Sequence, residues 1–237
     1  MSVLFIIKLM AENIAQRLAE VEKEIADAAT KANRNADEIK LVAVSKTHPS
    51  ETLKEAIAAG ANVLGENKVQ EAESKINELG RESAEWHLIG HLQANKARKA
   101  VVLFDVIHTL DSIELTGRLE RICIEENRES LSVLVQVDLA GETTKSGIAE
   151  KDLPSLIEFL KTCKHIKFDG FMVIPPFYED AEKVRPFFRR LRGIRDYFLP
   201  NGELSMGMSH DFPVAIEEGA TIVRVGTAIF GERQNKV

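Results

Sequence analysis

Residues 41–67 read LVAVSKTHPSETLKEAIAAGANVLGEN. An apolar run at 41–46 is followed by a helical segment at 49–59, and a second apolar run follows at 63–67. Strands that each feed a helix and then a further strand form a parallel sheet. The stretch therefore predicts one strand–helix–strand unit of an α/β fold.

The same alternation continues on both sides of this unit. Eight apolar runs have strand length, at residues 41–46, 63–67, 87–92, 106–110, 132–137, 170–174, 204–209 and 222–229. Helical stretches separate them, at residues 49–59, 68–79, 95–103, 113–126, 151–162, 179–198 and 213–218. Eight such units in 237 residues predict a single-domain (β/α)8 TIM barrel. An open doubly wound sheet is the alternative, but neither GxGxxG nor GxxxxGK[ST] occurs to supply its phosphate turn.

The N-terminal residues predict an extra helix before the barrel. Residues 11–32 are rich in Ala, Glu and Lys and place Ile14, Leu18, Val21 and Ile25 at helical spacing, so this helix is expected to cap one end of the barrel. Residues 1–10 are apolar, but they are too few to span a bilayer and lack the basic region of a secretory signal. We expect an N-terminal extension at 1–10, with Met10 as a candidate start, and one barrel domain at 11–237.

Composition excludes several classes of partner. The formal charge is -6 without a long block of like charge, so nucleic acid is not an expected partner, and no segment predicts a membrane span. Cys123 and Cys163 show neither disulfide nor metal spacing, which favours the cytoplasm. His87 and His91 lack a third ligand, so no metal is expected. A barrel needs no partner subunit, and a monomer is the default expectation.

The carboxyl ends of the strands are where a barrel builds its site. Lys46 ends the first run and shares a strand face with Val42 and Val44. Burial would lower the pKa of its amine and let it attack an aldehyde. A salt bridge with Glu66 is the ordinary alternative for such a lysine. The polar residues at the other strand ends are Asn67, His91, Gln93, His108, Asp111, Asp138, Ser209, His210, Arg224 and Thr227.

The last strand adds a second cation and a candidate anion site. Arg224 shares a strand face with Gly226, so it would repel Lys46 unless an anion lies between them or a carboxylate pairs with the arginine. Gly226 and Thr227 offer backbone N–H groups for a phosphate, and Ser209 is expected to cap the following helix. These spacings allow an aldehyde-bearing phosphate ester to bind at the lysine.

Five ordered motifs resemble the pyridoxal phosphate homeostasis proteins. They are residues 44–47 (VSKT), 65–67 (GEN), 86–96 (WHLIGHLQANK), 204–209 (LSMGMS) and 224–231 (RVGTAIFG), and the resemblance covers nearly all of the chain from about residue 12. It implies a barrel of the alanine racemase N-terminal type that binds pyridoxal phosphate. Lys46 would be the Schiff-base lysine and Arg224 would face the pyridine nitrogen. Ser209, Gly226 and Thr227 would hold the phosphate, and Asn67 would line the site.

The resemblance leaves three functions to weigh. A homeostasis protein would store, buffer or deliver pyridoxal phosphate, with apo-enzymes as possible acceptors. A racemase or related enzyme would need a second acid/base group opposite the lysine, which alanine racemases take from an additional domain that is not expected here. A pure interaction protein would not need the intact lysine, arginine and phosphate residues. We therefore expect cofactor binding with little or no amino-acid turnover and assign no catalytic residue.

Overall fold

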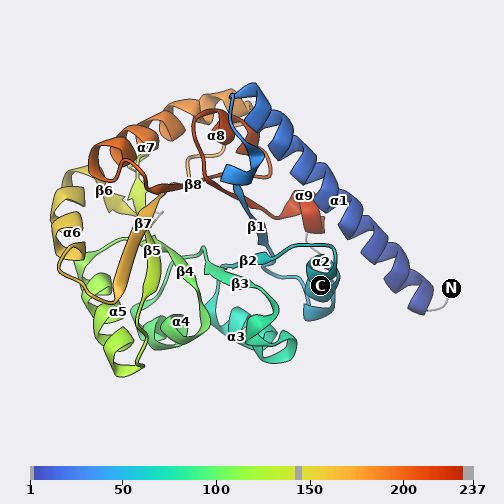
Figure 1. Cartoon of the computed structure of the whole chain (residues 1–237), viewed down its shortest axis with the longest axis horizontal. Helices are drawn as coiled ribbons and strands as arrows, with labels where there is room; N and C mark the ends of the chain where they lie inside the picture. The colour runs from blue at the N-terminus through green and yellow to red at the C-terminus, as the bar shows by residue number, and fades with distance from the viewer. Residues whose placement is uncertain (1–2, 142–145, 232–237) are drawn as a thin grey trace.

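The computed structural model describes residues 3–141 and 146–231, and it confirms the predicted barrel (Figure 1). Eight parallel strands form the wall, and pairing of the fourth with the fifth closes it. They are β1 (Lys40–Val44), β2 (Val63–Glu66), β3 (Glu85–Leu88), β4 (Val106–Leu110), β5 (Leu131–Asp138), β7 (Ile166–Met172), β8 (Glu203–Met208) and β9 (Ile222–Val225). A two-residue strand, β6 (Ile148–Ala149), pairs with β5 outside this wall.

Helices cover the outside of the wall in the order that the sequence predicts. They are α2 (Ser50–Ala58), α3 (Val69–Leu79), α4 (Ala97–Leu103), α5 (Ile113–Glu125), α6 (Leu153–Leu160), α7 (Arg185–Phe198), α8 (Phe212–Glu217) and α9 (Thr227–Phe230). Short 3-10 turns precede or link some of them: η1 (Ala36–Glu38), η2 (Arg81–Ser83), η3 (Ala94–Lys96), η4 (Glu150–Asp152) and η5 (Ala181–Val184). Parallel strands buried on both faces explain the continuous apolar runs.

The last predicted strand is shorter than expected. Residues 222–229 form one apolar run in the sequence, but β9 ends at Val225 and residues 227–230 form helix α9. Gly226 lies between them with φ -120° and ψ -72°, which ends the extended conformation. The chain therefore turns sharply at Gly226, immediately after Arg224.

The N-terminal helix α1 (Val3–Lys31) begins earlier than the predicted residue 11. Ile14, Leu18, Val21 and Ile25 are buried, as their spacing predicts. The helix packs along the outer wall against α2, α8 and α9 instead of capping one end (Figure 1). Because α9 has only four residues, α1 covers the part of the wall that the eighth helix of a barrel normally covers. The division between an extension at 1–10 and a domain from 11 stays a prediction.

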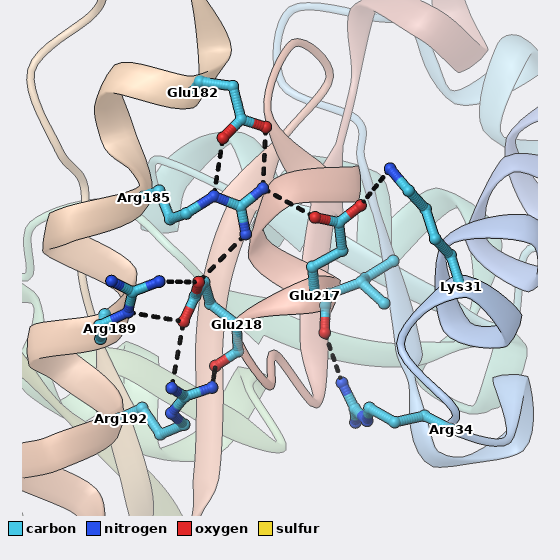
Figure 2. A network of polar contacts seen from close by, with 9 residues as sticks. Lys31, Arg34, Glu182, Arg185, Arg189, Arg192, Glu217 and Glu218 are labelled. Atoms are coloured by element: carbon cyan, nitrogen blue, oxygen red, sulfur yellow. Dashed lines mark hydrogen bonds and ion pairs between the residues drawn. The ribbon is translucent and has the colours of Figure 1, made fainter.

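An ionic network fastens α1 and α7 to α8 (Figure 2). Glu218 follows α8, is only 4% exposed, and forms ion pairs with the guanidinium groups of three α7 arginines. Glu217 pairs with Lys31 of α1 and with Arg185 of α7. This network therefore fixes the C-terminal end of α8, the helix that follows the Ser209 loop, to α1 and α7.

Within the described part of the chain, no helix is both long and apolar enough to cross a membrane.

Candidate functional site

A pocket of about 280 Å³ opens at the carboxyl ends of the strands. It brings together all six residues that the sequence singles out as a binding site, which come from four segments far apart in the chain: Lys46, Asn67, Ser209, Arg224, Gly226 and Thr227. The apolar part of the lining comes from barrel-interior side chains such as Val44, Ile89 and Ile174. The structure thus places the predicted residues around one cavity of a size that suits a small ligand.

Lys46 lies two residues beyond β1, on a loop that side chains of α3 hold in place. Thr47 has φ 69°, a left-handed conformation that a threonine rarely adopts. The buried ammonium of Lys75 donates to the carbonyl of Ser45 at 2.8 Å, and Glu71 accepts from the backbone N–H of Thr47. The residues on both sides of Lys46 are therefore held by side chains of α3.

Glu66, the partner that the alternative salt bridge of Lys46 would use, bonds to Lys75 and Ser45. Its Oε1 accepts from Lys75 Nζ at 2.6 Å and from Ser45 Oγ at 2.6 Å. Burial raises the pKa of Glu66, and the charge of Lys75 opposes the increase. Burial also favours a higher pKa for Glu71, but hydrogen bonds from Lys75 and Thr47 outweigh it and lower that pKa. These groups form a buried ionic cluster under the Lys46 loop, and sequence reasoning missed its central cation.

Arg224 is an almost completely buried cation at the base of the pocket, with 3% of its surface exposed. Its Nη1 donates to Ser205 Oγ at 2.6 Å and its Nη2 donates to the carbonyl of Val173 at 3.0 Å. Both acceptors are neutral, so these bonds differ from the carboxylate pair that a structural arginine usually makes. Burial lowers the pKa of Arg224 to about 10, against the attraction of Asp211, so the side chain stays charged at neutral pH.

Ser209 does not cap α8, and that prediction was wrong. The helix begins at Phe212 with Asp211 in the capping position, and Asp211 Oδ1 accepts from the backbone N–H of Met208 at 2.6 Å. Ser209 Oγ instead accepts from the backbone N–H of Gly226 at 3.2 Å. The hydroxyl therefore ties the loop after β8 to the turn after β9, which places Ser209, Gly226 and Thr227 on one side of the pocket.

Asn67 contributes a buried polar atom that no described residue hydrogen-bonds. Its Oδ1 is buried and accepts no hydrogen bond from the described residues. Gly90 allows this placement, because a Cβ there would lie 2.2 Å from the backbone oxygen of Asn67. A buried, unpaired amide oxygen in a pocket lining is costly unless a ligand or water satisfies it. The pocket thus fits a polar ligand.

The structure separates most of the remaining strand-end residues from the pocket. His210 lines it, but the described residues His91, Gln93, Asp111 and Asp138 lie outside its lining. His108 is fully buried in the barrel interior, in the middle of β4. Sequence reasoning missed His48, which lines the pocket and stacks on Phe230 at 5.0 Å between ring centroids. The position of His48 two residues after Lys46 was the only signal for it.

Comparison with known proteins identifies the family. The family model of the alanine racemase N-terminal domain matches residues 17–234. The pyridoxal phosphate homeostasis protein of Aquifex aeolicus is 42% identical over 227 residues, which cover 94% of this chain and 99% of that protein. The protein of the same name from Escherichia coli is 40% identical over 228 residues, 93% of this chain and 97% of that one. The chain belongs to the pyridoxal phosphate homeostasis protein family.

Solved structures agree with a barrel of the alanine racemase type for this chain. PipY of Synechococcus elongatus, solved with PLP bound, superposes with a TM-score of 0.81 at 40% identity, covering 92% of this chain and all of that chain. Alanine racemase from Corynebacterium glutamicum superposes with a TM-score of 0.67 at 19% identity, covering 96% of this chain and 62% of the racemase. The racemase likeness shows the shared fold alone.

Proposed function

We propose that this protein binds pyridoxal phosphate through a Schiff base on Lys46 and serves intracellular homeostasis of that cofactor by storing, buffering or delivering it. One observation carries the proposal: Lys46, a buried arginine and the turn at Gly226 and Thr227 lie around the same pocket. Family membership and the PLP-bound PipY structure support it.

Each group of the pocket has a partner on the cofactor. The amine of Lys46 would condense with the aldehyde, so that a C=N bond replaces the C=O bond and water leaves. Ser209 would donate its hydroxyl and Thr227 its backbone N–H to the phosphate, while Gly226, whose N–H bonds to Ser209 Oγ, would let the turn lie close to it. Arg224 would donate to the pyridine nitrogen, and Asn67 would supply its unpaired amide oxygen to the ligand. The pyridine ring would lie between Lys46 and Arg224, and the phosphate would offset their positive charge.

Binding without appreciable turnover is the better-supported form of this function. Bound pyridoxal phosphate supplies an electron sink, and a donating arginine beside its ring nitrogen keeps that nitrogen unprotonated and the sink weaker. Racemisation also needs a second acid/base group opposite Lys46. His48 and His210 are the titratable pocket residues available for it, so an amino-acid racemase is the alternative function.

The partners follow from the same proposal. We expect apo-enzymes that need pyridoxal phosphate to accept the cofactor, in the cytoplasm, where the two free thiols Cys123 and Cys163 would remain reduced. We expect a monomer, and elution at dimer mass in size-exclusion chromatography with light scattering would contradict that expectation.

Visible absorption with borohydride reduction tests the binding proposal. The wild-type protein mixed with pyridoxal phosphate should develop a yellow absorption band, and borohydride should bleach it while adding the cofactor mass to the peptide that contains Lys46. Lys46→Ala should lack both changes, whereas Lys151→Ala, which changes an exposed lysine of η4, should keep them. A wild-type protein that stays colourless and unlabelled would refute the proposal.

Chiral chromatography distinguishes binding from racemisation. The loaded wild-type protein should leave single enantiomers of common amino acids unchanged over hours. Rapid racemisation that disappears in Lys46→Ala would establish the enzyme instead. Replacement of His48 and His210 by Asn would then show which imidazole acts opposite the lysine.

A further inference from the structure

A column of polar side chains crosses the barrel interior from the Lys46 pocket to the opposite mouth. Arg224 donates to Ser205 Oγ at 2.6 Å, and Ser205 Oγ lies 2.9 Å from His108 Nδ1. His108 Nε2 lies 2.8 Å from His87 Nδ1, and His87 Nε2 lies 2.8 Å from Glu85 Oε1. Ser205, His108 and His87 are fully buried. These contacts join β9, β8, β4 and β3 through the interior.

The two ends of the column face different cavities. Arg224 lines the pocket with Lys46. Glu85 and His87 line a second cavity of about 740 Å³ at the amino ends of the strands, where Lys40 Nζ contacts both carboxylate oxygens of Glu85 at 3.0 and 3.2 Å. Ser205 and His108 belong to strands that are not neighbours in the barrel wall, so their contact spans its interior.

With both imidazoles neutral, a state that burial favours for each of them, the chemistry of the ends fixes the direction of every hydrogen bond between them. A guanidinium only donates and a carboxylate only accepts. Ser205 Oγ therefore accepts from Arg224 and donates its own proton to His108 Nδ1. His108 must then carry its proton on Nε2 and donate to His87, which in turn donates from Nε2 to Glu85. Both imidazoles are neutral in this arrangement, and each carries its single proton on Nε2.

We propose that Ser205, His108 and His87 are positioning residues, which form a one-way hydrogen-bonded chain that holds the Arg224 guanidinium toward the cofactor. The inference rests on the proposed function for its effect on pyridoxal phosphate, whereas the chain itself is a property of the protein without ligand. A proton added to His108 Nδ1 would remove the acceptor of the Ser205 hydroxyl and place a second cation near Arg224. Burial, the neighbouring His87 and the charge of Arg224 all lower the pKa of His108 and oppose that protonation.

Nitrogen-15 NMR of the histidine rings in the cofactor-free protein tests the chain directly. At pH 7 the wild type should show His87 and His108 as neutral Nε2–H tautomers. Ser205→Ala should change the His108 signal, because the donor to its Nδ1 is lost. A doubly protonated ring or an Nδ1–H tautomer at either histidine would overturn the chain, whether or not the protein binds pyridoxal phosphate.

Cofactor titrations test the positioning role. Ser205→Ala and His108→Phe should raise the Kd for pyridoxal phosphate about tenfold, the equivalent of one hydrogen bond to a charged group, and shift the visible band. His108→Asn should restore much of the affinity, because its Oδ1 can replace Nδ1 as the acceptor for Ser205. Thr116→Val removes a buried hydroxyl of α5 that donates to the Ser112 carbonyl and should change neither quantity.

The outcomes separate this inference from the proposed function. If His108→Phe does not fold, the test uses Ser205→Ala, which removes a single oxygen atom and disturbs the packing less. Wild-type affinity and spectrum in a folded Ser205→Ala protein would refute the positioning role. If the wild type binds no pyridoxal phosphate, the proposed function fails, and the same NMR tautomers then decide the hydrogen-bonded chain alone.

Discussion

The ammonium of Lys75 lies 2.8 Å from the carbonyl oxygen of Ser45, the residue immediately before Lys46. The same ammonium contacts Glu66 and Glu71, so one buried cation connects β1, β2 and α3 under the site. A buried pair adds little stability compared with apolar residues of similar volume, but the removal of one partner leaves the other charge uncompensated. Variants that remove one charge of this cluster should therefore be less stable than variants that remove both.

Lys75→Met should strongly destabilise the protein. It would leave the fully buried Glu66 carboxylate without a compensating charge, which should lower the free energy of unfolding by about 3–5 kcal/mol. The double variant Lys75→Met with Glu66→Gln removes both charges and should recover more than half of that loss. Urea denaturation of the three proteins measures the difference. Equal stabilities for the single and double variants would show that the charge of Glu66 does not matter.

The stability of the cofactor-free protein should fall on acidification below pH 6.5. Burial is the main cause that lowers the pKa values of His87 and His108, so in this range the unfolded chain binds protons that the folded chain does not. Each such histidine contributes a slope of about 1.4 kcal/mol per pH unit, down to its folded pKa. Denaturant titrations between pH 5.5 and 7 measure the slope.

A His108→Phe variant should show about half of that slope, because one of the two buried imidazoles is absent. The exposed imidazole of His91 provides the control, and His91→Asn should keep the wild-type slope. A slope that does not change in His108→Phe would mean that other groups cause the acid sensitivity.

Glu218→Gln should lower stability by about 1.5–3 kcal/mol, the usual range for hydrogen bonds to a charged group. Hydrogen bonds from Arg189 and Arg185 lower the pKa of Glu218, although burial favours a higher one, so the carboxylate is ionised at neutral pH. The more exposed Glu182, which also contacts Arg185, is the control, and Glu182→Gln should lower stability much less, because solvent screens its charge. Thermal unfolding measures both. Similar losses in the two variants would contradict the special role of Glu218.

Gly226→Ala should weaken phosphate binding. A Cβ at this position would lie 3.1 Å from the carbonyl oxygen of Val44, so the turn must shift by a few tenths of an ångström away from β1. The Kd for pyridoxal phosphate should rise, whereas the Kd for pyridoxal, which lacks the phosphate, should change less. Calorimetric titration with both ligands gives the two ratios, and equal changes would contradict a phosphate role for this turn.

Gly193→Ala is the matched control for that glycine. Gly193 lies on the exposed side of α7 with open space where a Cβ would project, so alanine should raise stability by about 0.5–1 kcal/mol through helix propensity. It should leave both ligand affinities unchanged. A loss of stability in this variant would indicate a contact that the structure does not show.

The fold was predictable because its signal is local and repeated. Each strand candidate carries its own apolar run and each helix its own periodicity, so eight of them predict the closed wall without knowledge of any contact. The pocket residues were predictable for a related reason. Carboxyl ends of parallel strands meet at one mouth, and Lys46, Asn67, Ser209 and Arg224 all lie at or near such ends.

The parts that sequence reasoning missed depend on contacts between distant segments. Lys75 looks like an ordinary helix lysine, and only the packing of α3 against β1 and β2 buries it. Ser209 has the sequence of a helix cap, but its hydroxyl accepts from Gly226 across two strand ends. Period-2 alternation orients His87 and His108 on their strands, but it does not identify which side chain each meets across the barrel.

The polar column also affects the register in which the strands pair. An interior filled with interchangeable aliphatic side chains would tolerate a shifted pairing, since one valine can replace another. Here, a one-residue slip of β4 against β3 would turn His108 outward and leave both Ser205 and His87 without their partner. The same slip in β9 would turn a buried guanidinium away from its two acceptors. In the folded barrel, the column therefore favours the native register over a one-residue slip.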